Sequence, residues 1–224
     1  MWLDRLNLLI DTNKLHDKCV LIIGIGGVGG YALEAICRSG VNNIIIVDND
    51  TIDVTNLNRQ IITNLNNIGN KKIDEAKKRI LSINDKCNVT CYDLFLDENN
   101  IYNIIDNHKI DYIIDACDTI SVKKELIRIS KKRNIKLITS MGTANKMHPE
   151  LLEIIDIRKT EYDPVAKILR KMVKDEKIKG KVMCVSSKEQ GIKNKKLGSN
   201  AFTPATAGLL LASYVINDMV GNNE

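Results

Sequence analysis

The chain has 224 residues, 44% of them hydrophobic, so it can bury one sizeable core. We expect one domain over residues 1–224, with a core at 1–140 and an extension at 141–224. The formal net charge is +5, and the apolar run at residues 201–216 is interrupted by threonine, proline and serine. That run is shorter than the roughly 20 residues that span a bilayer, which favours a packed helix over a membrane span.

The first apolar run, Val20 to Ile23, is followed by a glycine-rich stretch and then by a helical pattern at about 28 to 39. The stretch reads Gly24-Ile-Gly-Gly-Val-Gly29, with glycines at 24, 26, 27 and 29. In a strand, turn and helix context, such glycines let backbone amides approach a phosphate at a helix amino terminus. We therefore expect a nucleotide-binding loop here, although the loop alone is a weak signal.

A second apolar run, Ile44 to Val47, ends at Asp48-Asn-Asp50. Asp48 stands close to the roughly 20-residue spacing at which a carboxylate meets the ribose hydroxyls of a bound nucleotide. Up to this point a dinucleotide-dependent dehydrogenase also fits the pattern.

Polar and basic residues beyond the second strand separate these alternatives. Asn56-Leu-Asn-Arg-Gln60 forms a polar loop that includes Arg59, and Lys72 opens a helix expected at 71 to 83. A buried cation without an anionic partner is costly, so Arg59 and Lys72 beside one nucleotide predict a polyphosphate, and ATP is the natural ligand.

Three further strands and two helices complete the first half of the chain. The apolar runs are at 89–94, 112–115 and 136–139, and the helical patterns are at 98–107 and 121–133. Strands joined in this way by helices predict an α/β fold, a doubly wound and mostly parallel sheet of the Rossmann-like type. Asp118, in Ala116-Cys-Asp118, would then lie at the same sheet edge as the glycine loop and Asp48.

The second half of the chain has an α+β pattern. We expect strands at 151–157 and 182–186, a helix at 164–173 that Asp163 caps, and a last helix that begins at Thr203. Residues 187–200 read as a mobile polar loop. Residues 156–196 contain 13 Lys and Arg against 6 Asp and Glu, an excess of 7 that suggests a footprint for a polyanion. A solvated basic surface is the alternative.

The cysteines are scattered, with no C-x-x-C pair among the six, and the amino terminus lacks an uninterrupted apolar signal segment. Free thiols and a cytoplasmic location are therefore expected. The three histidines form no spaced cluster with cysteine, which argues against zinc. Cys184 is the thiol of most interest, although burial as a small hydrophobe is the commoner fate.

Together these motifs resemble the adenylating enzymes of the ubiquitin-activating type, and the resemblance extends from Arg5 to the last helix. It implies that Gly27 contacts the phosphates, that Asp48 (with Asp50 beside it) meets the ribose, and that Asp118 holds Mg²⁺. The triphosphate would be bound by residues Asn56, Arg59 and Lys72. Arg5, in Asp4-Arg-Leu-Asn-Leu-Leu9, matches an arginine that in this family reaches into the partner subunit of a homodimer.

The residues themselves leave plainer roles open for two of these side chains. Asp118 could cap the helix that starts near Ser121, and Arg5 could pair with Asp4 or Asp11.

The second half resembles the branch of the family that acts on a modified tRNA adenosine. The matching segments are Thr139–Pro149, Asp156–Thr160, Asp163–Arg170 and Cys184–Glu189. This resemblance implies ATP-dependent adenylation of the threonylcarbamoyl carboxylate, followed by cyclisation with loss of water. Activators of ubiquitin-like sulfur-carrier proteins are the alternative, but they commonly carry two C-x-x-C zinc pairs that this chain lacks. A sulfur-relay partner protein is also possible in this family.

Overall fold

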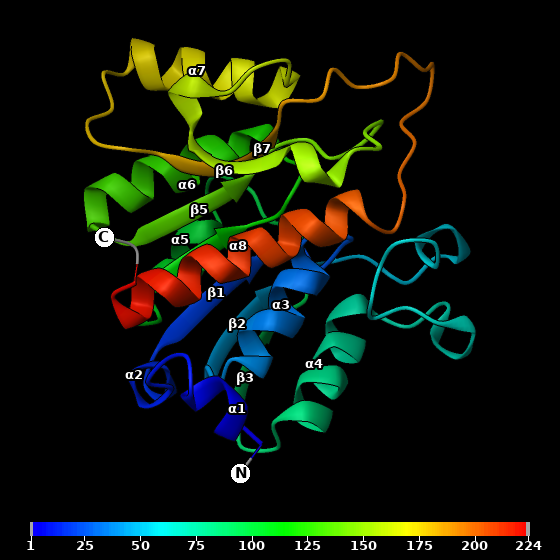
Figure 1. Cartoon of the computed structure of the whole chain (residues 1–224), viewed down its shortest axis with the longest axis vertical. Helices are drawn as coiled ribbons and strands as arrows, with labels where there is room; N and C mark the ends of the chain where they lie inside the picture. The colour runs from blue at the N-terminus through cyan, green and yellow to red at the C-terminus, as the bar shows by residue number, and fades with distance from the viewer. Residues whose placement is uncertain (1, 223–224) are drawn as a thin grey trace.

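The computed structural model describes residues 2–222, whose strands form one twisted sheet (Figure 1). The strand order is β3-β2-β1-β4-β5-β7-β6, and every neighbouring pair is parallel except β6 with β7. The strands are β1 Cys19–Ile23, β2 Asn43–Val47, β3 Asn88–Tyr92, β4 Tyr112–Asp115, β5 Lys136–Ser140, β6 Leu152–Asp156 and β7 Met183–Ser187. Strands from both halves of the chain thus share a single sheet.

Helices cover both faces of the sheet, as expected for parallel strands with buried faces. One face packs against α3, α4 and α8, and the other against α5, α6 and α7. The helices are α1 Asp4–Asn7, α2 Asn13–His16, α3 Gly29–Arg38, α4 Lys72–Ile83, α5 Ile101–Ile105, α6 Ile120–Arg133, α7 Pro164–Asp175 and α8 Thr203–Val220. Short 3₁₀ turns occur at η1 Val54–Asn56, η2 Leu65–Asn67, η3 Pro149–Leu151 and η4 Ile157–Lys159.

The last helix lies across the sheet directly beside α3 (Figure 1). The contact is close because α8 presents Gly208, where a Cβ atom would lie 2.2 Å from the carbonyl oxygen of Val28. α8 is apolar enough to be largely buried, and among residues 2–222 no helix has the length and hydropathy to cross a membrane.

The predicted fold class is confirmed, and the five strands predicted for the first half are each correct to within two residues. Asp163 caps α7, with its carboxylate accepting from the amide of Ala166 at 2.9 Å, as expected. The helix predicted at 98–107 was too long, since α5 begins only at Ile101. Asp97 and Asn100 exchange hydrogen bonds with each other's backbone amides, and this turn delays the start of the helix.

Candidate active site

The glycine loop joins β1 to α3 at the edge of the sheet where the parallel strands end, which we call the carboxyl edge. Gly24 has φ +83°, and a Cβ atom there would lie 2.9 Å from the carbonyl oxygen of Ala116. At Gly29 a Cβ atom would lie 1.8 Å from the oxygen of Gly24, so no larger residue fits. The chain therefore makes a tight turn that presents the amino terminus of α3 to the crevice, a suitable place for a phosphate.

Gly26 and Gly27 lie where three segments meet. A Cβ atom at Gly27 would lie 3.3 Å from Cβ of Pro204 in α8 and 3.4 Å from Cγ of Arg59. Gly26 faces the amide nitrogen of Gln60, whose side-chain oxygen is buried without a hydrogen-bond partner. Sequence reasoning assigned nothing to Gln60 or Pro204, although Gln60 ends the Asn56–Gln60 motif.

Asp48 follows β2 and connects the glycine loop to the next turn. One carboxylate oxygen accepts from the amide of Ile25 at 2.6 Å, and the other accepts from the amide of Asp50 at 2.9 Å. The half-buried side chain is thereby fixed beside the phosphate loop, the position in which a carboxylate meets ribose hydroxyls.

Lys72, at the start of α4, is only 4% exposed, and its ammonium group lies 2.6 Å from the carboxylate of Asp50. Lys72 therefore has an anionic partner within the chain, and the prediction that only a bound polyphosphate would pair with it is wrong. Asp50 was expected at the nucleotide, and its side chain is 59% exposed. Lys72 thus lies at the crevice, and in the absence of a ligand the carboxylate of Asp50 balances its positive charge.

The other two residues predicted to contact phosphate lie in the 3₁₀ turn η1, which ends at Asn56, and three residues after it, at Arg59. Asn56 is 9% exposed, and its side-chain oxygen accepts from the amide of Asp53, which closes the turn. Arg59 donates from Nη1 to the carbonyl of Thr55 at 2.8 Å and to the side chain of Asn58 at 2.9 Å. Among the described residues Arg59 has no carboxylate within ion-pair distance, so its charge remains available for a ligand.

Asp118 lies three residues beyond β4 at the same edge, and its side chain is exposed. The capping role considered for it is wrong, because the residue that precedes α6 is Thr119 and that helix has no side-chain cap. Within residues 2–222 no group of three or more His, Cys, Asp and Glu could hold a metal ion. Mg²⁺ bound with a nucleotide needs only one or two carboxylates, because phosphate oxygens and water supply the other ligands.

A buried polar network joins the carboxyl ends of β4 and β5, close in the chain to Asp118. Lys123 of α6, 2% exposed, donates to Asp115 at 3.0 Å, to Thr139 at 3.2 Å and to the carbonyl of Ser140 at 2.9 Å. Burial alone would lower the pKa of Lys123, but the adjacent carboxylate of Asp115 outweighs it and raises the pKa. The network fixes the ends of β4 and β5, where the two strands enter the crevice.

Arg5 does not belong to the crevice of its own chain. It lies in α1, and the side chain of Leu3 packs against Gly40, which follows the carboxyl end of α3. The ten residues of α3 separate that end from the glycine loop by about 15 Å. Arg5 is exposed, and within residues 2–222 no ion pair joins its side chain to Asp11.

Cys184 lies inside the sheet in β7 and is fully buried. Burial raises the pKa of its thiol to about 12, helped by the nearby carboxylates of Asp156 and Asp163. The burial expected for this cysteine is therefore confirmed, and a buried, protonated thiol is a poor nucleophile.

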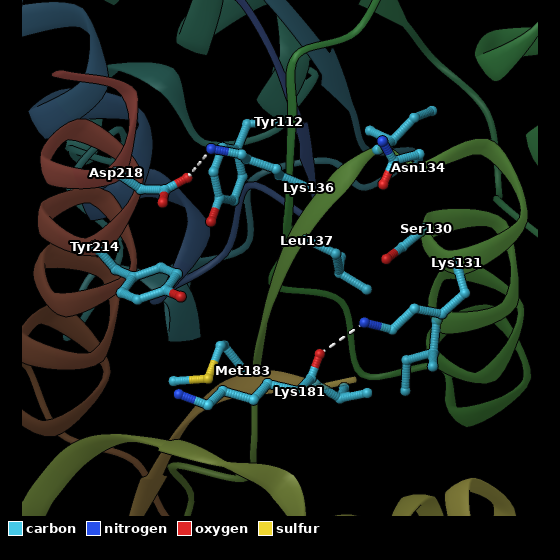
Figure 2. Close-up of a pocket in the computed structure, with 13 residues that line it drawn as sticks. Tyr112, Ser130, Lys131, Asn134, Lys136, Leu137, Lys181, Met183, Tyr214 and Asp218 are labelled. Carbon is cyan, nitrogen blue, oxygen red and sulfur yellow. Dashed lines mark hydrogen bonds and ion pairs between the residues drawn. The ribbon is translucent and has the colours of Figure 1, made fainter. Parts of the chain in front are cut away.

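The pocket in Figure 2, of about 300 Å³, lies at the opposite, amino edge of the sheet. Tyr112 and Lys136, the first residues of β4 and β5, both line it. In Figure 2 the ammonium group of Lys136 contacts Asp218 at 2.6 Å, and Lys131 donates to the carbonyl of Lys181 at 2.7 Å. None of the predicted site residues contributes to this pocket.

Comparison with known proteins agrees with the geometry at the carboxyl edge. The sequence matches the ThiF family over residues 7–223. It is 39% identical to the tRNA threonylcarbamoyladenosine dehydratase of Bacillus subtilis, with 94% of this chain and 90% of that protein covered. The crystal structure of the Escherichia coli dehydratase in complex with ATP has a TM-score of 0.88 and 33% identity, and covers 94% of this chain and 88% of that one.

The chain is therefore a member of the ThiF family, whose Rossmann-like fold and glycine-loop crevice it shares. Within that family it belongs with the tRNA threonylcarbamoyladenosine dehydratases, of which the B. subtilis and E. coli proteins match it over nearly its whole length.

Proposed function

We propose that this chain cyclises threonylcarbamoyladenosine in tRNA, with ATP used to activate the carboxylate of that modification. The observation that carries the proposal is the meeting, at one sheet edge, of the glycine loop, Asp48, Arg59, Lys72 and Asp118 in a chain that resembles this dehydratase group throughout. The E. coli relative was crystallised with ATP and also with AMP. The whole chain would act as a single adenylating domain.

The first step needs no general base. A carboxylate with an ordinary pKa of about 4 is ionised at neutral pH and can attack the α-phosphorus directly. The bond from that phosphorus to pyrophosphate breaks, and an acyl adenylate is left. Negative charge builds on the phosphoryl oxygens, where Arg59 and Lys72 would stabilise it, Arg59 with a planar fork and Lys72 as a point charge.

The second step is intramolecular. An atom of the same modification attacks the activated carbonyl and AMP leaves, so that the nucleoside has lost one water whose oxygen remains on AMP. Holding both reacting groups in one crevice can contribute several kcal/mol to the lowering of the barrier. No thioester is required, which agrees with the burial of Cys184.

Mg²⁺ bound with the nucleotide would neutralise part of the phosphate charge. The exposed carboxylate of Asp118 would hold it, because it has no hydrogen bond or ion pair with any other described side chain and oxygen ligands suit this ion. Asp50 is paired with Lys72 and is the less suitable ligand.

Two partner proteins also belong to the proposal. The chain would form a homodimer in which Arg5, remote from its own crevice, completes the site of the partner subunit. A sulfur-relay protein could support the reaction in the cell.

The direct test is an assay of the purified protein with ATP, Mg²⁺ and tRNA that carries the modification. We expect a nucleoside lighter by one water on mass spectrometry, and no pyrophosphate release with matched tRNA lacking the modification. Lys72→Ala should lose magnesium-dependent ATP binding in calorimetry, whereas Lys77→Ala, at an exposed position of the same helix, should retain it. Adenylation of a glycine-tailed carrier protein, with no lighter nucleoside, would refute the proposal.

A further inference from the structure

The outer side of α7 carries a row of lysines. Lys167, Lys171 and Lys174 are exposed and follow the i, i+4, i+7 spacing that places side chains on one side of a helix. The buried side chains of α7, Leu169, Met172 and Val173 among them, lie on the opposite side. In Figure 1 α7 lies at the top border of the molecule, and no other element covers its outer side.

The lysines of this row have no intramolecular ion pairs among the described residues. Other surface helices differ, because α3, α4 and α6 each pair a cation with a carboxylate one turn away. These pairs are Arg38 with Glu34, Lys78 with Glu75, and Arg128 with Glu125. On α7 the exposed carboxylate is Asp175, and no lysine lies within 4 Å of it.

Like charges one turn apart destabilise a helix by about 0.2 to 0.5 kcal/mol per pair. Lys174 has some compensation, since a cation in the last turn suits the helix dipole. Lys167 and Lys171, which precede the last turn of the helix, have none. No ion pair within the described part of the chain offsets the repulsion among these lysines, which is consistent with an anionic ligand outside the chain.

The row connects the two edges of the sheet. It begins one turn after Asp163, whose carboxylate contacts Lys146 at 3.1 Å and faces Gly142 at the carboxyl edge. The twelve residues of α7 extend about 18 Å towards the amino edge. Three more exposed lysines, Lys177, Lys179 and Lys181, follow α7 in the chain, and Lys181 lines the pocket of Figure 2 at that edge.

We propose that this lysine row, residues 167, 171, 174, 177, 179 and 181, is a docking surface for the phosphate backbone of the tRNA substrate. The proposal rests on the proposed function and deepens it. The lysines of α7 share one exposed side of the helix, and none of these three lines the pocket of Figure 2, which suits an extended polyanion better than a single phosphate. The row contains no aromatic side chain that could stack on a base, so it would position the RNA without reading its sequence. One end of the bound RNA would then reach the carboxyl edge, where the modified nucleoside reacts.

The test compares two triple variants with the same loss of charge. One is Lys167→Gln/Lys171→Gln/Lys174→Gln, in which glutamine keeps helix propensity. The control is Lys77→Gln/Lys86→Gln/Lys109→Gln, which removes three exposed lysines elsewhere. Affinity for unmodified tRNA is measured without ATP over a range of salt concentrations, so that binding is scored independently of the reaction.

Counterion release lowers the logarithm of affinity by about 0.7 to 0.9 per log unit of salt for each phosphate contact. Removing three contacts should therefore reduce the salt slope by about 2 to 3 and weaken binding by about 100-fold near 0.1 M salt. The control should keep the slope of the unaltered protein. ATP affinity should be unchanged in both variants, and the melting temperature of the α7 variant should not fall, because its substitutions relieve repulsion between like charges.

Equal slopes for the two variants would overturn the proposal. So would a loss in the α7 variant of binding to anionic lipid vesicles with no loss of tRNA binding, since the surface would then serve a membrane. If the unaltered protein binds tRNA through this row but yields no lighter nucleoside, the docking surface stands and the proposed reaction fails.

Discussion

The buried ion pair between Lys123 and Asp115 allows a direct test of how much the polar network at the ends of β4 and β5 contributes to the free energy of unfolding. Lys123→Met removes the cation and leaves the fully buried carboxylate of Asp115 with two uncharged side-chain donors, the hydroxyl of Thr139 and the thiol of Cys117. Breaking a buried pair by removing one partner typically costs about 3 to 5 kcal/mol. For a chain of this size that corresponds to a fall in melting temperature of about 6 to 20 °C.

The measurement is thermal and urea unfolding of four proteins: Lys123→Met, Asp115→Asn, the double variant, and Lys124→Met as a control. Lys124 is adjacent but half-exposed, so its replacement should change stability by about 0.5 kcal/mol or less. The double variant should lose less unfolding free energy than the two single variants lose together. The difference should be about 1 kcal/mol or more, because no uncompensated charge remains. If Lys123→Met unfolds no earlier than Lys124→Met, or if the losses simply add, the pair does not stabilise the strand ends.

Further predictions concern the glycine loop, the subunit contact, the buried thiol and the polar loop. Gly29→Ala should abolish ATP binding measured by calorimetry, because its Cβ atom would lie 1.8 Å from a carbonyl oxygen that cannot yield without moving the loop. Mixing inactive Arg5→Ala with inactive Asp118→Ala should restore some activity, since a hybrid dimer has one intact site; no recovery after verified subunit exchange would place Arg5 outside the partner's site. Cys184→Ala should keep at least half of the activity per folded molecule, and loss of turnover with normal ATP binding would show that the thiol reacts. Replacing the three lysines at 193, 195 and 196 should weaken tRNA binding and flatten its salt dependence without a change in ATP affinity.

The parallel core of the fold could be predicted from sequence because isoleucine and valine runs bounded by glycine or aspartate are typical of strands buried on both faces. The position of β7 between β5 and β6 could not. Register and neighbour choice among these last strands depend on tertiary packing, and their local pattern fits several orders.

Most of the candidate site could be located from motifs, but its internal pairing could not. Lys72 meets Asp50 only because η1 and the adjoining turn bring residues 22 positions apart together. Lys123 was missed although a signal was present. It is in helical register with Leu126, Ile127 and Ser130, so a lysine on the buried side of α6 indicated a hidden carboxylate partner.

The contact between Gly208 and Val28 also bears on when the protein can become functional during its synthesis. The glycine loop is made early, yet Pro204 and the rest of α8, which pack against it, are made much later. Until α8 arrives, the apolar side of α3 is uncovered and the loop lacks one of its walls. Contacts between such distant positions form slowly, and intermediates with exposed apolar surface aggregate readily. The nascent chain is thus most exposed to misfolding just before its nucleotide site is completed.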